Sequence, residues 1–164
     1  MKSPRIRHII WLLLLWLMPG SFVVMGQNVN GESAQEAENV QDAIRLLTEH
    51  PQAQIIAGGR DVLVQIREGK RAGVELVSIY GLDELRGVSL EEDETLRIGS
   101  LTSFSHITKN ELIQKYIPVL GEAVDMVGGP QIRNIGTIGG NTCNGVTSAD
   151  SASTLFALDA IIEL

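Results

Sequence analysis

The sequence predicts an α+β protein with two small lobes, and three observations lead to this prediction. Helical and strand patterns alternate from residue 39 to residue 79. A β-hairpin pattern and then a run of short helices occupy residues 86–128. Two glycine-rich stretches, at residues 57–61 and 128–141, each follow an apolar segment. A chain of 164 residues is long enough for one domain or for two small lobes that share a ligand.

The first 26 residues differ from the rest of the chain. Basic residues precede Ile9–Met18, an apolar run that Pro19 and Gly20 bring to an end. This pattern is typical of a signal peptide and is too short for a membrane span. The alternative is that translation begins at Met25 and that residues 1–24 are a mis-assigned start.

The first lobe is predicted at residues 27–82, and its first part, up to residue 38, is a polar lead-in without a strand pattern. Asn39 is expected to cap a helix, and Asp42, three residues later, completes a capping box. Pro51 closes this helical segment. The apolar residues on one face of the helix are Val40, Ala43, Ile44 and Leu47.

A strand, a glycine turn, a helix and a second strand complete this lobe. The first strand is expected at Ile55–Ala57, and it runs directly into Gly58 and Gly59. A short helix at Val62–Arg67 and a strand at Val74–Ile79 follow.

The second lobe is predicted at residues 83–164 and opens with a β-hairpin. Its strands, Arg86–Leu90 and Thr95–Ser100, flank an acidic turn at residues 91–94. A helix follows at about residues 103–110 and resumes toward Tyr116. The next helix begins at Pro118, because proline suits the first turn, and ends at Gly128.

The remainder of this lobe is harder to assign from pattern. The polar, glycine-rich run up to Ser151 is expected to be a long functional loop or a compact irregular segment. A short helix at Ala152–Leu158 and a strand at residues 160–164 follow. A domain seldom stops inside an apolar strand, because an unpaired edge invites aggregation, so the chain is expected to be a fragment.

The two glycine-rich stretches indicate anion binding. Glycine adopts positive φ at little cost and lets backbone amides approach an anion closely. The second stretch also carries the polar residues Thr137 and Asn141. Two such loops in one short chain favour a dinucleotide bound through its pyrophosphate.

Composition and motifs exclude several other classes of protein. The net charge of −7, without a basic cluster after residue 7, argues against nucleic acid as a partner. Cys143 is the only cysteine, which excludes an internal disulfide, a cysteine-ligated iron–sulfur cluster and a cysteine-rich zinc site. The histidines His8, His50 and His106 have no metal or triad spacing, and neither a Walker loop nor G-x-G-x-x-G or G-x-S-x-G in its required setting is present. No catalytic residue and no metal ligand is therefore predicted.

Two sets of residues carry a resemblance to a known family. The first is Ile55-Ile56-Ala57-Gly58-Gly59 with Asp61-Val62. The second is Gln131-Ile132-Arg133-Asn134, Thr137, Gly139-Gly140-Asn141 and Ser148-Ala149-Asp150-Ser151. Together they resemble the FAD-binding subunits of molybdenum hydroxylases, and among these the xanthine dehydrogenase type. The resemblance is collinear from about Val40 to Leu164.

The resemblance implies a two-lobed α+β FAD-binding fold of the vanillyl-alcohol-oxidase type, with FAD between the lobes and an incomplete second lobe. Thr137 and Asn141 would donate to phosphate oxygens, and the glycines would supply bare amides. The alternative is that the glycines only permit tight turns. The cofactor-binding residues that the resemblance implies are Ile55, Ile56, Ala57, Gly58, Gly59, Arg60, Asp61, Thr137, Ile138, Gly139, Gly140, Asn141 and Asp150.

The resemblance also implies a role in electron transfer. Electrons from a purine or similar heterocycle would leave a molybdenum centre on one partner chain and cross 2Fe-2S clusters on another. They would then reach this FAD and pass to NAD or another acceptor. The rival hypothesis is a truncated, non-catalytic remnant without flavin. Because the family is usually cytoplasmic, the resemblance favours a start near Met25, and an exported or membrane-attached protein is the alternative.

Some residues depart from the family pattern or keep two interpretations. Arg60 stands where the family usually has threonine, so it either pairs with the pyrophosphate or crowds the pocket. Ser153 replaces a common proline. Arg133 either contacts a phosphate or a partner, or it pins its own loop. Cys143 is interpreted as a small packing residue, with a ligand role as the alternative.

Overall fold

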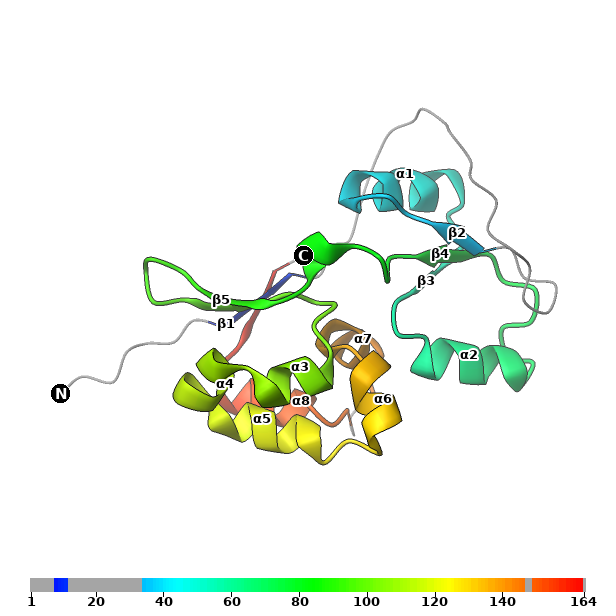
Figure 1. Cartoon of the computed structure of the whole chain (residues 1–164). Helices are drawn as coiled ribbons and strands as arrows, with labels where there is room; N and C mark the ends of the chain where they lie inside the picture. Colours follow the sequence, from blue (N-terminus) through cyan, green and yellow to red (C-terminus); the bar gives the residue numbers. More distant parts are fainter. Residues whose placement is uncertain (1–7, 12–33, 147–148, 164) are drawn as a thin grey trace. The chain divides into compact units, whose positions relative to one another are not determined.

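The computed structural model describes residues 8–11, 34–146 and 149–163. The chain divides into two compact units, which we call the N-terminal unit (Leu14–Glu84) and the C-terminal unit (Met1–Leu13 with Leu85–Leu164). Each unit contains its own sheet (Figure 1). The lobe boundaries that the sequence suggests, residues 27–82 and 83–164, stay predictions. Among the described residues, no helix combines the length and apolar character that crossing a membrane requires.

The N-terminal unit is built on a three-stranded parallel sheet. The strand order is β2–β4–β3, with β2 at Ala34–Glu36, β4 at Leu76–Ser78 and β3 at Gln54–Ile56. Helix α1 (Val40–Glu49) connects β2 to β3, and α2 (Arg60–Arg67) connects β3 to β4. These two crossovers run in opposite directions, so right-handed connections place α1 and α2 on opposite sides of the sheet, as Figure 1 shows.

Helix α1 begins where the sequence predicts, but its cap differs in detail. The side chain of Asn39 accepts a hydrogen bond from the Asp42 amide at 2.8 Å, which confirms the N-cap. The Asp42 carboxylate accepts from the Glu38 amide at 3.1 Å, one residue before the position that a capping box requires. The predicted apolar face is only partly buried: Ile44 and Leu47 are half-buried, and Leu46, which the prediction leaves out, is buried. The buried residues of α1 are Val40, Ala43 and Leu46.

Two other elements of this unit differ from expectation. The lead-in before residue 39 contains strand β2, which pairs in parallel with β4. Three residues are too few to display an alternating pattern, so backbone pairing alone reveals this strand. Helix α2 begins at Arg60 instead of Val62, because Gly59 in the left-handed conformation turns the chain directly into the helix.

The C-terminal unit contains a four-stranded mixed sheet in the order β5–β6–β1–β7. Strands β5 (Val88–Leu90) and β6 (Leu96–Ile98) form the predicted antiparallel hairpin, just after the 3-10 turn η1 (Asp83–Leu85). Strand β1 (His8–Trp11) pairs in parallel with β6 on one side and with β7 (Ile161–Glu163) on the other. Strand β1 belongs to the signal-like leader, whose residues 1–7 and 12–26 lie outside the described residues. Both alternatives for the leader therefore stay predictions.

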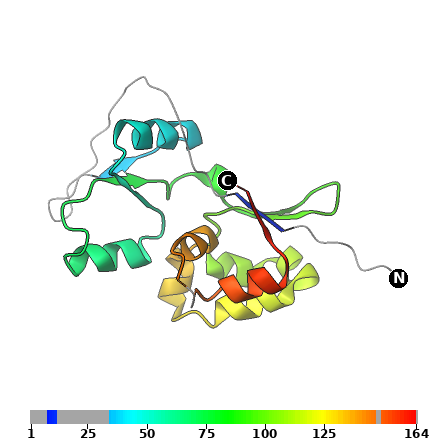
Figure 2. The same ribbon diagram turned by 180° about the vertical axis from the view of Figure 1, so that it is seen from behind.

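Short helices pack beside this sheet (Figure 1). Their bounds are α3 Phe104–Lys109, α4 Glu111–Tyr116, α5 Pro118–Asp125, α6 Pro130–Ile135, α7 Ile138–Cys143 and α8 Ala152–Ala157. The break between α3 and α4 has a local cause: Asn110 ends α3, and its side chain caps α4 by accepting from the Leu112 and Ile113 amides. Seen from behind, α8 lies beside α5 and leads into β7 (Figure 2).

Residues 128–146 are more regular than either sequence-based alternative. They contain α6 and α7 where a loop or an irregular segment was expected. Pro130 occupies the first turn of α6, and Thr137 caps α7, so each helix begins at a residue suited to that position. Six-residue helices are too short to show a clear apolar period, which explains why pattern alone misses them.

The core of the C-terminal unit joins the sheet to these helices. Val124, Leu120 and Ile107 are fully buried and come from α5 and α3. The complete cluster is Leu96, Ile98, Phe104, Ile107, Ile113, Ile117, Leu120, Val124, Val127, Ile138 and Leu155.

Truncation of Leu120 to alanine is expected to destabilise the protein by about 2–5 kcal/mol, because it opens a cavity in this core. The matched control is Val119→Ala on the same helix, since Val119 is 49% exposed. This control is expected to change the free energy of unfolding by less than about 0.5 kcal/mol. Urea unfolding followed by circular dichroism measures both values, and equal losses would contradict the packing described here.

Candidate functional site

The first predicted segment, Ile55–Asp61, joins β3 to α2 in the N-terminal unit. Ile55 and Ile56 are half-buried in the edge of the sheet. The Ile56 carbonyl accepts from the Ile79 amide at 3.0 Å, which fixes the end of the strand. Ala57 and Gly58 then lead to Gly59, and the helix starts at the next residue. This strand–glycine–helix arrangement confirms the local structure that the sequence predicts.

Gly59 is the residue on which this turn depends. Its φ of +71° is a conformation that residues with a side chain adopt only with strain. A β-carbon here would also lie 3.0 Å from Leu63 Cδ1 and 3.2 Å from Ile56 Cδ1. The backbone conformation therefore favours glycine, and a β-carbon would also press against these two side chains.

The N-terminus of α2 is open to a ligand. Gly59 is the N-cap and provides no side-chain hydrogen bond, so the amides of the first turn keep their capacity to donate. The helix dipole adds a partial positive charge at the same end. The two side chains that follow, Arg60 and Asp61, are both exposed.

The second predicted segment, Thr137–Asn141, belongs to the C-terminal unit and is tied to residues 100–104. The Ile138 amide donates to the Thr102 carbonyl at 3.1 Å, and the Gly139 amide donates to the Ser100 carbonyl at 2.8 Å. The Phe104 amide donates to the Gly136 carbonyl at 3.1 Å. These bonds hold the start of α7 against the helical layer, and the fully buried Ile138 side chain joins the core.

The expectation that Gly139 and Gly140 supply bare amides is wrong. The Gly139 amide bonds to Ser100, and the Gly140 amide donates to the Thr137 hydroxyl at 3.2 Å. The physical reason is that α7 is capped by Thr137 and packed against a neighbouring strand end, so its first turn is already satisfied. Gly139 serves close packing instead, because a β-carbon would lie 2.6 Å from Ser100 Cβ and 2.7 Å from Ser100 O.

The structure brings Asn141 and Asp150 into one local cluster. The side-chain oxygen of Asn141 accepts from the Ser151 hydroxyl at 2.7 Å and from the Ser151 amide at 3.1 Å. Ser151 is completely buried, and the neighbouring Asp150 is exposed. The bond thus clamps the Asp150 turn to the end of α7. Sequence reasoning missed the role of Ser151, because no spacing rule links two polar residues ten positions apart.

Arg133 pins its own loop, which decides between the two interpretations. Its guanidinium donates to the carbonyls of Val127 at 3.2 Å and Gly128 at 2.8 Å. It also pairs with Asp125 at 3.3 Å. The side chain therefore satisfies carbonyls at the end of α5.

Cys143 does not act as a small packing residue, because its side chain is exposed at the end of α7. Desolvation of the thiol by neighbouring atoms nevertheless raises its pKa above the ordinary value. Among the described residues, no group of three histidine, cysteine or acidic side chains could hold a metal ion.

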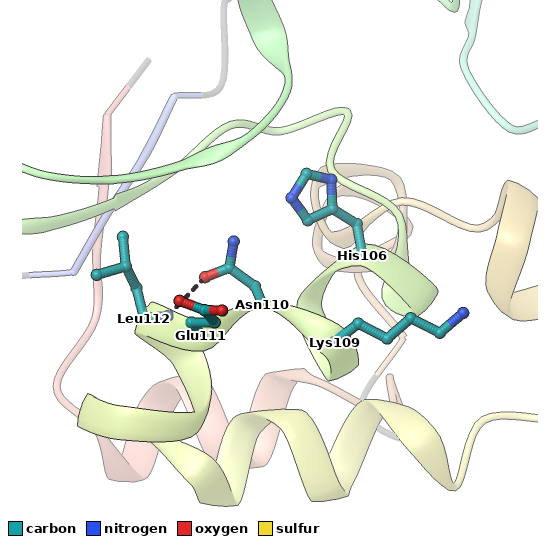
Figure 3. A pocket seen from close by; sticks show the side chains of 5 residues that line it. All are labelled: His106, Lys109, Asn110, Glu111 and Leu112. Atoms are coloured by element: carbon teal, nitrogen blue, oxygen red, sulfur yellow. Dashed lines mark hydrogen bonds between the residues drawn. The ribbon is translucent and has the colours of Figure 1, made fainter.

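A shallow depression of about 540 Å³ lies on the C-terminal unit where α3 meets α4 (Figure 3). Its lining residues are His106, Lys109, Asn110, Glu111 and Leu112. None of them is among the predicted site residues. The Asn110 side chain is already engaged in capping α4 through the Leu112 amide, so the depression follows from the helix junction and receives no ligand assignment.

Comparison with known proteins places these segments in a family. Residues 29–164 match the family described as "FAD binding domain in molybdopterin dehydrogenase". The chain belongs to this family. The resemblance stated from the sequence is thereby confirmed, and FAD is the cofactor that the family description names.

Two relatives and one solved structure illustrate the membership. The xanthine dehydrogenase FAD-binding subunit of Escherichia coli is 46% identical over 132 residues, which cover 80% of this chain and 45% of that protein. The nicotinate dehydrogenase FAD-subunit of Eubacterium barkeri is 37% identical over 110 residues, 67% of this chain and 37% of that protein.

The solved structure is a carbon monoxide dehydrogenase from Hydrogenophaga pseudoflava that lacks the Mo-pyranopterin moiety of its cofactor. It matches with a TM-score of 0.65 and 32% identity, over 68% of this chain and 39% of that chain. The predicted α+β FAD-binding fold is confirmed by this likeness. The chain spans less than half the length of these relatives.

The residues of this FAD-binding domain fit the cofactor, and the fit differs between the two segments. In the N-terminal unit it rests on backbone: an uncapped helix N-terminus beside glycines is suited to a pyrophosphate. In the C-terminal unit it rests on the Asn141 amide nitrogen and the Asp150 carboxylate, because Thr137 is buried and its hydroxyl caps α7. The assignment of individual residues to FAD stays a prediction.

The substitution Gly139→Ala is expected to destabilise the domain by about 1–3 kcal/mol, because the added methyl overlaps the Ser100 backbone. The control Gly140→Ala is expected to stay within about 1 kcal/mol of the parent. Its methyl would lie 2.9 Å from one side-chain atom, the Thr137 hydroxyl oxygen, instead of from backbone, and the gain in helix propensity offsets part of this contact. Thermal unfolding followed by circular dichroism compares the two. A larger loss for Gly140→Ala would contradict the close approach at Ser100.

Proposed function

We propose that this chain is the FAD-binding part of the flavin subunit of a molybdenum-containing hydroxylase. The observation that carries the proposal is the 46% identity to a xanthine dehydrogenase FAD-binding subunit over 80% of the chain. FAD, when bound, would receive electrons and pass them to a further acceptor. The chain's own residues bind and orient that group, and none is assigned as an acid or a base.

The backbone at Gly58 and Gly59 is proposed to bind the pyrophosphate. Amides of the first turn of α2 donate to phosphate oxygens, and the dipole of this eight-residue helix stabilises the negative charge. Gly59 makes the turn possible because its φ of +71° suits a residue without a β-carbon. Ile55, Ile56 and Ala57 support this turn from the strand that precedes it.

Side chains of the C-terminal unit are proposed to supply further contacts. The Thr137 hydroxyl accepts from the Gly140 amide and the residue is only 3% exposed, so Thr137 is proposed to support the site by capping α7 from within. Asn141 uses its oxygen on Ser151, which leaves its amino group as a donor. Asp150 is exposed and repels phosphate, so its carboxylate suits hydroxyl groups of the cofactor.

The partners are proposed to be a molybdenum-cofactor subunit and a 2Fe-2S subunit. These 164 residues hold one cysteine, too few for a cysteine-ligated cluster, so this part of the subunit is proposed to receive electrons from clusters on another chain. The relatives favour a purine such as xanthine as the reductant. NAD is the proposed acceptor, and a cytoplasmic location follows from the family resemblance.

The second candidate is a remnant that binds no flavin. The observation in its favour is that the amides at the start of α7 already have acceptors within the chain. Flavin binding by the purified protein separates the two candidates.

Replacement of Gly59 by alanine is expected to shift the amides at the start of α2, because the new β-carbon is strained at a φ of +71° and meets Leu63 and Ile56. The expected loss of FAD affinity is about tenfold or more, comparable to the loss of one charge-assisted hydrogen bond. The control is Gly69→Ala, because Gly69 has a similar φ of +77° but no atom within 4 Å of a new β-carbon. Quenching of flavin fluorescence on titration gives both dissociation constants. Equal losses would show that backbone strain alone, and not the anion site, accounts for the effect.

Electron transfer is tested with the subunit co-purified with its molybdenum and 2Fe-2S partners. Addition of xanthine without an acceptor is expected to bleach the visible absorbance of the oxidised flavin, and addition of NAD is expected to restore it. Nicotinate is the alternative reductant, because a nicotinate dehydrogenase subunit is also a relative. Bound flavin that neither compound reduces would contradict the proposed substrates and leave only FAD binding.

A further inference from the structure

Arg60 occupies the first position of α2, next to the glycine turn. Side chains of an α-helix tilt toward its N-terminus. An arginine at the first position therefore extends over the turn that precedes the helix, which contains Gly58 and Gly59. A guanidinium extended in that direction would lie beside the amides that the proposed function assigns to the pyrophosphate.

The guanidinium of Arg60 has no partner among the described residues. Other arginines of the chain are engaged: Arg45 pairs with Asp42 and Glu49, and Arg133 pairs with Asp125 and backbone carbonyls. Arg60 is exposed and makes neither a hydrogen bond nor an ion pair within the described part of the chain. Arg67, at the other end of the same helix, is equally exposed and equally unpaired there.

The charge of Asp61 beside the glycine turn explains why a cation at Arg60 would favour anion binding. Asp61, the next residue, is exposed and sits in the first turn of α2, where its carboxylate stabilises the helix dipole. The same carboxylate repels a phosphate that approaches the turn. A cation at Arg60 offsets this repulsion and presents planar donors that match phosphate oxygens.

We propose that Arg60 is a binding residue for the pyrophosphate of FAD and makes this site prefer the dianionic dinucleotide over uncharged flavin. The inference rests on the proposed function, because it takes the glycine turn as the pyrophosphate site. The backbone amides and the guanidinium then bind the same anion, and part of the affinity for FAD becomes sensitive to salt.

The test compares Arg60→Gln with Arg67→Gln in the full chain. The two substitutions remove the same charge from opposite ends of one helix, and both sites are exposed. FAD and riboflavin are titrated at low and high potassium chloride, and circular dichroism verifies the fold of each variant. Arg60→Gln is expected to weaken FAD binding at least about tenfold and to flatten its dependence on salt. Arg67→Gln is expected to match the parent, and riboflavin binding is expected to be equal in all three proteins.

Each other outcome overturns the inference. Unchanged FAD binding by Arg60→Gln would show that Arg60 does not contact the pyrophosphate, and tighter binding would show that it crowds the pocket. In both cases the proposed function stands. An equal loss in Arg67→Gln would show a general effect of net charge. If the parent chain itself binds no FAD, the proposed function fails, and the role of Arg60 fails with it.

Discussion

The hydrogen bonds between residues 100–104 and residues 136–139 are the constraint on which the candidate site of the C-terminal unit depends. They convert a polar, glycine-rich segment into two short helices that pack on an apolar core. The close approach requires a residue without a side chain at Gly139. Once α7 is fixed in this way, Asn141 reaches Ser151 and holds Asp150 at the surface. Local packing thus positions the polar groups before any ligand arrives.

Glycine has a different structural role in each of the two glycine-rich segments. At Gly59 the missing side chain allows a left-handed turn and leaves a helix N-terminus uncapped. At Gly139 the missing side chain allows the start of α7 to lie against the backbone of Ser100, and the Gly139 amide donates its hydrogen bond to that residue. A glycine motif therefore does not by itself imply an anion site. What distinguishes the two cases is whether the amides that follow the glycine have internal acceptors.

The sequence predicts most of the fold because its signals are local. The Asn39 cap, the β5–β6 hairpin and the proline at the start of α5 follow from residue types at fixed positions. Strand β2, helix α6 and helix α7 escape prediction because each is too short to show a period. The motif residues themselves could be found from sequence. The Asn141–Ser151 bond and the Ser100 contact could not, because they join positions that only the folded chain brings together.

A net charge of −7 is unfavourable for binding a dianionic cofactor unless positive charge lies close to the anion. Net charge acts over distances that physiological salt screens, whereas binding is decided within a few ångströms of the anion. The open amides of α2 and its dipole supply a positive field of that short range. Asp61 stabilises the free helix but weakens this field. The same carboxylate therefore favours folding and disfavours anion binding. An adjacent cation reconciles them, because it restores the field at the anion while the carboxylate continues to cap the dipole.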